Sequence, residues 1–182
     1  MLYVKIPKDR VGVLVGPKGQ VKTQIEQSCG VALQIDSKTG DVTIIPKEEA
    51  VATGMVGLAA RDIVKAIARG FSPERAMRLT KDDVYLSVID IRDFAGKRRK
   101  HVQRVRGRVI GKKGKTRRII EKLARLQSAS NGDAAGIIGD LVCMDIAKRA
   151  VEMLLEGSEH AATYRYLEGR RRDLKFMEIS ME

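Results

Sequence analysis

Aromatic residues are scarce in this chain. They make up 4% of it and include no tryptophan, which excludes modules that stack RNA bases on an aromatic sheet surface. Cysteine and histidine occur twice each without paired spacing, which excludes a zinc site. Cys29 and Cys143 lie far apart in sequence, so we expect two free, buried thiols. No cofactor and no metal are expected.

Long apolar runs are also missing. No stretch is long enough to cross a membrane, and the N-terminal residues MLYVKIPKDR reach charged positions too early for a signal peptide. We therefore expect an intracellular, cytoplasmic protein with no membrane partner. A hydrophobic content of 43% is enough for packed cores in one large domain or two small ones.

Positive charge is what the chain has in excess. The formal net charge is +12 and the pI is about 9.9. Residues Lys97 to Arg125 contain 14 Lys and Arg and one acid, Glu121, which gives +13 and leaves −1 for all other residues. At the centre of this segment lies GKKG, Gly111 to Gly114. Such a segment points to an anionic polymer as partner.

The chain contains an internal repeat. The loop GPKG, Gly16 to Gly19, and the residues around it recur 95 positions later around GKKG. The matched pairs are Gly12 and Gly107, Leu14 and Val109, Val15 and Ile110, Gly16 and Gly111, Lys18 and Lys113, Gly19 and Gly114, Ile25 and Ile120, and Glu26 and Glu121. Each half predicts the order strand, short helix, GxxG, helix, strand, strand, helix.

The predicted elements of the first half follow hydrophobic periodicity and turn residues. They are a strand Leu2–Ile6, helices Arg10–Val15 and Gln20–Cys29 with Gly30 as a left-handed cap, strands Val31–Ile35 and Val42–Ile45, and a helix Glu49–Arg69. A short helix or linker spans Phe71–Lys81, with Ser72 as N-cap and Pro73 in the first helical position.

The second half is predicted in the same way. Its elements are a strand Tyr85–Ile91, helices before and after GKKG, strands Leu126–Ser130 and Ala134–Ile138 around the turn Asn131–Asp133, and a helix from the N-cap Asp140 to Glu156. That helix has a predicted apolar stripe at Val142, Ile146, Ala150, Met153 and Leu154. A last helix, with Ser158 as a possible cap, runs to about Phe176. The expected domains are 1–70, a linker or short helix 71–82, 83–157, and a C-terminal helix and tail 158–182.

A GxxG turn between two helices lets another backbone approach closely, and the amides there can face phosphate. We expect RNA contacts from the two loops and the cations beside them: Gly16, Pro17, Lys18, Gly19, Lys22, Arg104, Arg108, Gly111, Lys112, Lys113, Gly114, Lys115, Arg117 and Arg118. The expected floor of a groove for unstacked bases is Val15, Val21 and Ile25 in the first half, and Ile110, Ile119 and Ile120 in the second.

These two framed motifs, VGPKG and IGKKG, resemble those of KH domains. The resemblance covers about 150 residues and implies an α+β fold. It would consist of two type I KH modules, each β-α-α-β-β-α with helices on one face of a three-stranded antiparallel sheet, plus a C-terminal helix.

A narrower resemblance is carried by GFSPERAMRL (Gly70 to Leu79), KRRK, GKKGKTRRIIE and the tail from Gly157 to His160. These segments look like archaeal members of the partner-of-Nob family, which is related to KRR-type pre-ribosomal proteins. The resemblance implies binding of the 3′ region of 16S ribosomal RNA during maturation of the small subunit. It also implies association with the alpha subunit of translation initiation factor two and with the endonuclease Nob.

The second half departs from the KH pattern in two places. KH domains usually have glycine after the second helix, where the first half has Gly30 and the second has Ala124 followed by Arg125. The next strand of the second half, LQSAS, has serines where the first half has Leu33 and Ile35. We therefore expect a more polar groove floor in the second module.

Other patterns in the sequence have simpler interpretations than catalysis or nucleotide binding. GKKGKT is not a phosphate-binding loop of the GxxxxGK[ST] type, because position 109 is Val109. The carboxylates of Asp82, Asp83, Asp90 and Asp93 fit turn caps and salt bridges better than a metal-dependent nuclease. Tyr164 and Tyr166 fit helix packing better than base stacking. Two further GxxG matches, Gly54–Gly57 inside the long helix and Gly136–Gly139 at a strand end, lack cations and are predicted to be packing glycines.

The sequence thus favours non-catalytic binding of single-stranded RNA, with most of the electrostatic affinity in the second module. The alternative is a protein–protein adaptor in ribosome assembly or translation initiation, in which one module contacts protein.

Overall fold

The structure is a computed structural model that describes residues 1–47, 57–124, 126–131 and 133–180. The chain forms two compact units, Met1–Leu86 and Ser87–Glu182. The first contains 13 Lys and Arg against 10 Asp and Glu, a net charge of +3, and the second contains 22 against 13, a net charge of +9. The excess positive charge therefore lies mainly in the second unit.

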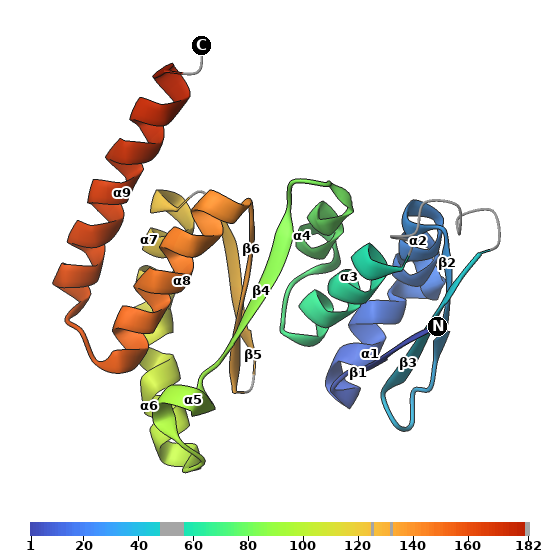
Figure 1. Ribbon diagram of the computed structural model, residues 1–182. Coiled ribbons are helices and arrows are strands. Elements are labelled where there is room, and N and C mark those ends of the chain that lie inside the picture. Colours follow the sequence, from blue (N-terminus) through green and yellow to red (C-terminus); the bar gives the residue numbers. More distant parts are fainter. Residues whose placement is uncertain (48–56, 125, 132, 181–182) are drawn as a thin grey trace. The chain divides into compact units, whose positions relative to one another are not determined.

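The first unit is a three-stranded sheet with helices on one face (Figure 1). The strands β1 (Leu2–Lys5), β2 (Val31–Ile35) and β3 (Asp41–Pro46) pair antiparallel in the order β1-β3-β2. The helices are α1 (Lys8–Val15), η1 (Pro17–Gly19), α2 (Gln20–Cys29), α3 (Leu58–Ala68), α4 (Pro73–Ala76) and η3 (Met77–Thr80). Leu14, Ile25, Leu33, Ile44 and Ile63 are each at most 2% exposed and form the centre of its core.

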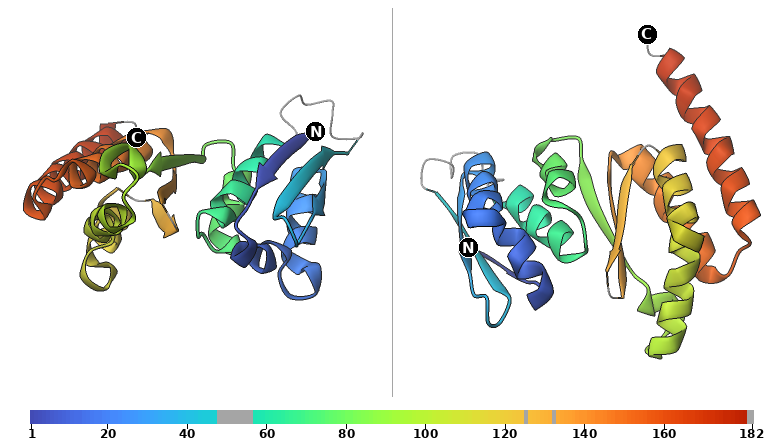
Figure 2. Two further views of the ribbon diagram at one scale, coloured as in Figure 1. Left: turned by 90° about the horizontal axis from the view of Figure 1, so that it is seen from below. Right: turned by 180° about the vertical axis from the view of Figure 1, so that it is seen from behind.

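The second unit repeats this arrangement, as Figure 2 shows from two further sides. Its strands β4 (Tyr85–Asp90), β5 (Gln127–Asn131) and β6 (Ala134–Gly139) lie in the order β4-β6-β5. Its helices are α5 (Arg92–Ala95), α6 (Arg99–Ile110), η4 (Lys112–Gly114), α7 (Lys115–Leu123), α8 (Leu141–Glu156) and α9 (His160–Ser180). The predicted α+β class, with two such modules and a C-terminal helix, is confirmed.

The segment between the modules is folded. Helices α4 and η3 contact α3, and Phe71, Ala76 and Leu79 are 1%, 0% and 5% exposed. Ser72 and Pro73 occupy the predicted N-cap and first helical positions, but the Ser72 side chain makes no capping hydrogen bond. The first unit therefore continues past residue 70 to Leu86, while the proposed division at 71–82 stays a prediction.

The long helix predicted from Glu49 begins, in its described part, at Leu58, with Gly57 as its N-cap at φ 99°. Gly57 is therefore not inside the helix as predicted, and residues 48–56 lie outside the described residues. Gly136 and Gly139 lie in β6. A Cβ at Gly139 would approach Leu126 Cβ to 3.0 Å, which is the packing role expected.

Helix α8 confirms one prediction and corrects another. The Asp140 side chain caps it, accepting a hydrogen bond of 2.8 Å from Cys143 N. The predicted apolar stripe was wrong at its N-terminal end, because Val142 is 52% exposed while Cys143 is buried. Each helical residue turns by about 100°, so a stripe displaced by one position points to a different side.

The cap predicted for the last helix was also wrong. Helix α9 begins at His160, two positions after Ser158, and Thr163 N donates to the carbonyl of Glu159. The Ser158 carbonyl instead accepts from an arginine, as described below.

Candidate nucleic-acid interface

The two GxxG loops have almost the same backbone. Gly16 and Gly111 both have φ 72°, with ψ of 176° and 172°. Lys18 and Lys113 both lie in the left-handed region, at φ 50° and 52°. These two are the positive-φ residues other than glycine in the described part of the chain, and that conformation costs a residue with a Cβ about 1–2 kcal/mol. Both modules therefore hold the same strained loop.

The first glycine of each loop is required by close packing. A Cβ at Gly16 would approach Val21 Cγ2 to 2.4 Å, and a Cβ at Gly111 would approach the Thr116 Oγ1 to 2.2 Å. Val21 and Thr116 are equivalent in the repeat and nearly the same shape. The last glycines, Gly19 and Gly114, have nothing within 4 Å of such a Cβ. At these two positions only the positive φ favours glycine over other residues.

A glutamate supports each loop helix in the same way. The Glu26 carboxylate accepts from Leu33 N at 2.7 Å, and the Glu121 carboxylate accepts from Ser128 N at 2.9 Å. Each carboxylate also lies near a cation one turn earlier, Lys22 at 3.8 Å and Arg117 at 3.7 Å. Lys22 and Arg117, both predicted RNA contacts, thus also neutralise a carboxylate that fixes the neighbouring strand.

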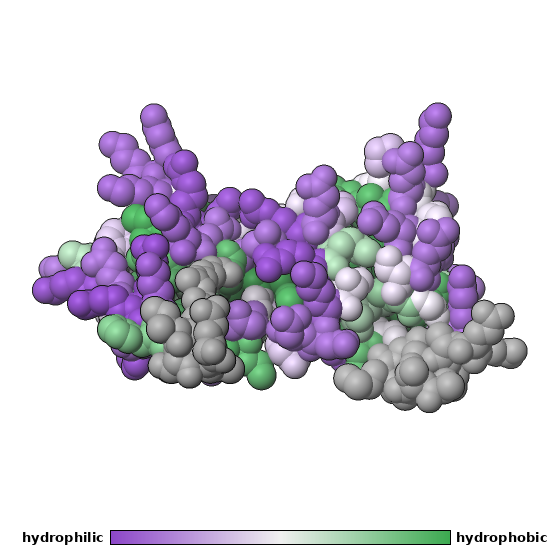
Figure 3. Space-filling model, turned by 90° about the horizontal axis from the view of Figure 1, so that it is seen from above, coloured by the Kyte–Doolittle hydropathy of each residue, from purple (hydrophilic) through white to green (hydrophobic). Residues whose placement is uncertain are grey.

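The loop cations are exposed. Lys18, Lys112, Lys113 and Lys115 are all exposed, as is Pro17. Arg118, which is also exposed, donates back to the carbonyls of Lys113 and Gly114, at 2.8 and 3.4 Å. Helix α7 starts directly after Gly114, so its first amides and its positive dipole end lie beside the loop. Figure 3 shows hydrophilic side chains over much of the visible surface, with smaller apolar areas between them.

Two further predicted contacts are engaged in different ways. Arg104 donates to Nε2 of His101 at 3.0 Å on the exposed side of α6. Arg108 instead points inward, and its guanidinium donates to the carbonyls of Leu154 and Ser158 at 3.1 and 2.6 Å. Arg108 therefore joins α6 to the end of α8 and the start of the α9 connection.

The first module has the same kind of anchor from a different position. Arg10 donates to the carbonyls of Ile67 and Phe71 at 2.8 and 2.7 Å, at the end of α3. Arg10 and Arg108 are not equivalent in the repeat, where Arg10 matches Val105. Sequence comparison of the two halves could not reveal this shared role, and Arg10 was not predicted as a functional residue.

The groove-floor residues lie at different depths. Val15, Val21 and Ile110 are half-buried, whereas Ile25 and Ile120 are 0% and 2% exposed and belong to the cores beneath. In the second module an apolar pocket is lined by Ile110, Ile120, Arg117, Ser128 and Ala129, among others. Ile119 is not in that lining and packs against the core.

The pocket of the second module includes two polar side chains, Arg117 and Ser128. The buried Arg117 Nε makes no hydrogen bond to the described residues, although it lies 3.7 Å from the Glu121 carboxylate. The Ser128 hydroxyl donates to Glu121 at 3.2 Å. A base edge could hydrogen-bond such polar atoms beside the apolar wall, while the more polar floor expected for this groove stays a prediction.

Helix α9 braces the second loop. The hydroxyls of Tyr164 and Thr116 are 2.9 Å apart, so α9 contacts the residue directly behind Gly111. His160 Nε2 donates to the carbonyl of Arg108 at 3.0 Å, and its ring meets that of Tyr164 edge-on. Tyr166 packs against the core and lies beneath the Arg170 guanidinium. The predicted packing role of both tyrosines is confirmed.

Of the four acids considered for a nuclease, Asp90 has a structural partner. Asp90 accepts from the backbone and guanidinium of Arg92, as expected for a salt-bridge partner. Within the described ranges, no group of three or more His, Cys, Asp and Glu could hold a metal, and no helix there is long and apolar enough to span a bilayer. Cys29 and Cys143 are free thiols, but only Cys143 is buried as expected, whereas Cys29 is half-buried. Desolvation raises the pKa of Cys29.

A GxxG loop between the first two helices of a three-stranded α+β unit defines a KH domain, and this chain has two. A family model described as a eukaryotic type KH domain (KH-domain type I) matches residues 85–172, and one described as a KH domain matches residues 1–56. The chain is therefore a tandem KH protein.

Comparison with individual proteins identifies the family of KH proteins to which the chain belongs. It is 48% identical over 172 residues to a KH domain-containing protein of Methanocaldococcus jannaschii, covering 94% of this chain and 74% of that one. The crystal structure of Dim2p from Pyrococcus horikoshii OT3 matches with a TM-score of 0.84 and 47% identity, covering 92% of this chain and 97% of that one. The chain belongs to the family of Dim2p and the PNO1 proteins, as the resemblance predicted.

Two other matches bear on function. The pre-rRNA-processing protein PNO1 of Phaeosphaeria nodorum is 26% identical over 162 residues, which are 88% of this chain but 62% of that one, so this chain spans less than two thirds of that relative. The structure of an a/eIF2alpha-aDim2p-rRNA complex from Pyrococcus horikoshii OT3 matches with a TM-score of 0.85 and 46% identity, covering 94% of each chain.

Proposed function

We propose that this protein binds single-stranded ribosomal RNA without catalysis, during maturation of the small ribosomal subunit, and that the GKKG loop is its main contact. The observation that carries the proposal is the pair of exposed lysines, Lys112 and Lys113, at the N-terminus of α7 in a unit of net charge +9. Solved and curated relatives named for an rRNA complex and for pre-rRNA processing support it.

The geometry gives each part of the loop a role. Gly111 and Gly114 leave room for an RNA backbone, and the start of α7 presents amides and a positive dipole to phosphate. Lys112 and Lys113 add mobile charge. Beside the loop, Ile110 and Ser128 line a small hollow against which an unstacked base would rest, as KH domains take about four nucleotides. The bound RNA would be the 3′ region of 16S rRNA.

The first module supports a second role. Its unit has a net charge of only +3, so its loop attracts RNA less strongly and its surface is free to contact protein. The complex of a relative that is 46% identical contains a/eIF2alpha, and the sequence resembles the partner-of-Nob family. We include a/eIF2alpha and the Nob endonuclease as partners in the proposal, together with a cytoplasmic location and the absence of enzymatic activity.

The division of labour is tested by opposite charge changes in the two loops. Replacing Lys112 and Lys113 by Asp should weaken binding to a 16S rRNA 3′ fragment far more than Lys18→Asp does. It should also lower the slope of log K against log salt by up to about 0.7 per lost phosphate contact. Equal losses from both loops would contradict the proposal.

The adaptor role is separated from RNA binding by affinity capture with and without ribonuclease. An RNA binder loses its ribosomal partners after ribonuclease treatment, whereas an adaptor keeps them.

A further inference from the structure

Among the described residues of the second unit, some basic side chains have hydrogen-bond or ion-pair partners within the protein, and others do not. Arg92, Arg108, Arg117, Arg118, Arg149 and Arg170 are engaged with carboxylates or carbonyls of the protein. In contrast, no hydrogen bond or ion pair is found for Arg171, Arg172 and Lys175 within the part of the chain that the structure describes. These three cations lie in one five-residue stretch of α9 and are available to a ligand.

The three cations line one place. An open cleft between α7 and α9 is lined by Leu123, Glu168, Arg171, Arg172 and Lys175. Glu168 is the single acid of this lining, so the cleft has a net charge of +2. The lining contains no aromatic side chain on which a base could stack. Its chemistry therefore suits phosphate, which arginine can bind through two parallel N–H groups.

The cleft is connected to the GKKG loop by α7. At the start of α7, Thr116 contacts Tyr164; near its end, Leu123 shares the cleft with Arg171. Both helices advance by seven residues between these contacts, so α7 and α9 run in the same direction side by side (Figure 2). Seven residues of helix place the cleft about 10 Å beyond the loop.

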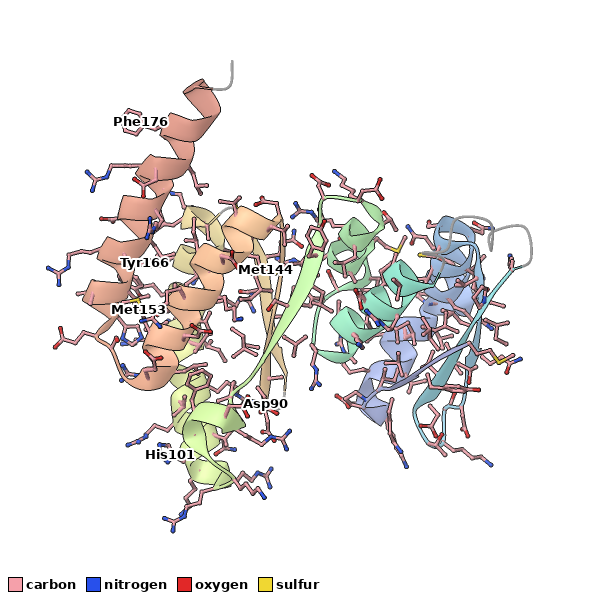
Figure 4. The ribbon with its side chains drawn as sticks, in the orientation of Figure 1. Asp90, His101, Met144, Met153, Tyr166 and Phe176 are labelled. Carbon is pink, nitrogen blue, oxygen red and sulfur yellow. The ribbon has the colours of Figure 1, made fainter. Side chains whose placement is uncertain are left out.

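The exposed face of α7 bridges this distance. Lys115 and Lys122 are exposed and seven residues apart, which puts them on one face of the helix. They therefore add two exposed cations on α7, one beside the GKKG lysines and one next in sequence to the cleft residue Leu123. Figure 4 shows Tyr166 on the part of α9 that lies along α8, and Phe176 farther on, towards the C-terminus. The cleft residues of α9, Glu168 to Lys175, lie between these two labelled residues in the sequence.

We propose that the α7–α9 cleft is a second RNA-binding site, which holds the phosphates of the segment flanking the nucleotides in the GKKG groove. It reads no bases; it adds affinity and extends the footprint along α7. This inference rests on the proposed function, because the flanking segment is positioned by the nucleotides bound at GKKG.

The test compares two lengths of RNA. One probe is a single strand of about six nucleotides from the 3′ region of 16S rRNA, enough for one KH groove; the other extends it to about twenty. The variant replaces Arg171, Arg172 and Lys175 together by Gln. We expect its affinity for the long RNA to fall at least about tenfold and its salt slope by up to about two units, with affinity for the short RNA unchanged.

A charge-matched control removes three exposed lysines from the first unit, Lys8, Lys38 and Lys47, also as Gln variants, and should leave both affinities near wild type. Unchanged affinity of the cleft variant for the long RNA would overturn the proposal, even if an acidic protein partner were lost. Equal loss on both lengths would overturn it too. Failure of the wild-type protein to bind the short RNA would refute the proposed function instead.

Discussion

Arg108 has two possible roles, contact with RNA or anchoring of α9, and a single substitution distinguishes them. The sequence places Arg108 among the RNA contacts, but its guanidinium spans the carbonyls of Leu154 and Ser158. Hydrogen bonds from a charged group contribute about 1.5–3 kcal/mol each. Because the site is only partly buried, we expect about 3 kcal/mol for the pair. Arg108→Met keeps the apolar stem and removes both bonds.

The loss should appear first in α9, which begins directly after the anchored connection. A change of about 3 kcal/mol corresponds to about a hundredfold rise in the exchange rate of amides that open with α9. Hydrogen exchange of the full-length protein, followed by mass spectrometry of α9 peptides, measures this directly. The α1 and α2 peptides serve as an internal reference, since they belong to the first unit and Arg108 to the second.

Arg104→Met is the matched control. Arg104 lies one turn earlier on α6 and bonds the exposed His101, so its loss should leave α9 exchange within about threefold of wild type. The reasoning would be refuted if Arg108→Met left α9 exchange unchanged but lowered RNA affinity as a loop lysine does. Arg108 would then be an RNA contact, as the sequence predicted.

Two further predictions concern stability. Gly111→Ala should lower the free energy of unfolding by about 3–5 kcal/mol, because it combines a strained φ with a clash against Thr116. Gly114→Ala should lower it by about 1 kcal/mol, because only the positive φ opposes that substitution. Urea unfolding of both variants measures the difference, and equal losses would contradict the packing argument. Backbone N–H groups of Lys38 and Thr39 hold the pKa of Asp36 below its usual value, so its stabilising effect is present above the unfolded pKa and lost as pH falls through the folded one. Asp36→Ala should therefore lower the unfolding midpoint at pH 7, and the difference from wild type should vanish as pH falls through the folded pKa; a pH-independent difference would contradict this.

The local features of the fold could be predicted because each depends on short-range patterns. Gly30 was identified as a left-handed cap and adopts φ 63°, and Asp140 caps α8. The hairpin of the second module followed from its turn, although Asn131 pairs with Ala134 and so belongs to β5. Periodicity also gave the helices beside both loops, since these bury one face each.

The contacts between distant segments could not be predicted from one sequence. Arg10 and Arg108 perform the same anchoring from positions that the repeat does not match, and their acceptors are backbone carbonyls, which leave no residue-type signal. The contact of Tyr164 with Thr116 depends on how α9 docks, and the first half has no counterpart of that helix. The loops were therefore predictable from the sequence, whereas the contacts that fix their flanking helices were not.

The two loops share a backbone, so their difference must come from the surroundings. In the first module, Val21 and Thr23 stand where the second has Thr116 and Arg118. Neither can reproduce the bond from Thr116 to α9 or the bonds from Arg118 to the loop carbonyls. The second loop is thus held by its own helix and by α9, and less ordering free energy is lost when RNA binds. Charge and preorganisation both favour the same loop, which is why we place the main RNA contact at GKKG.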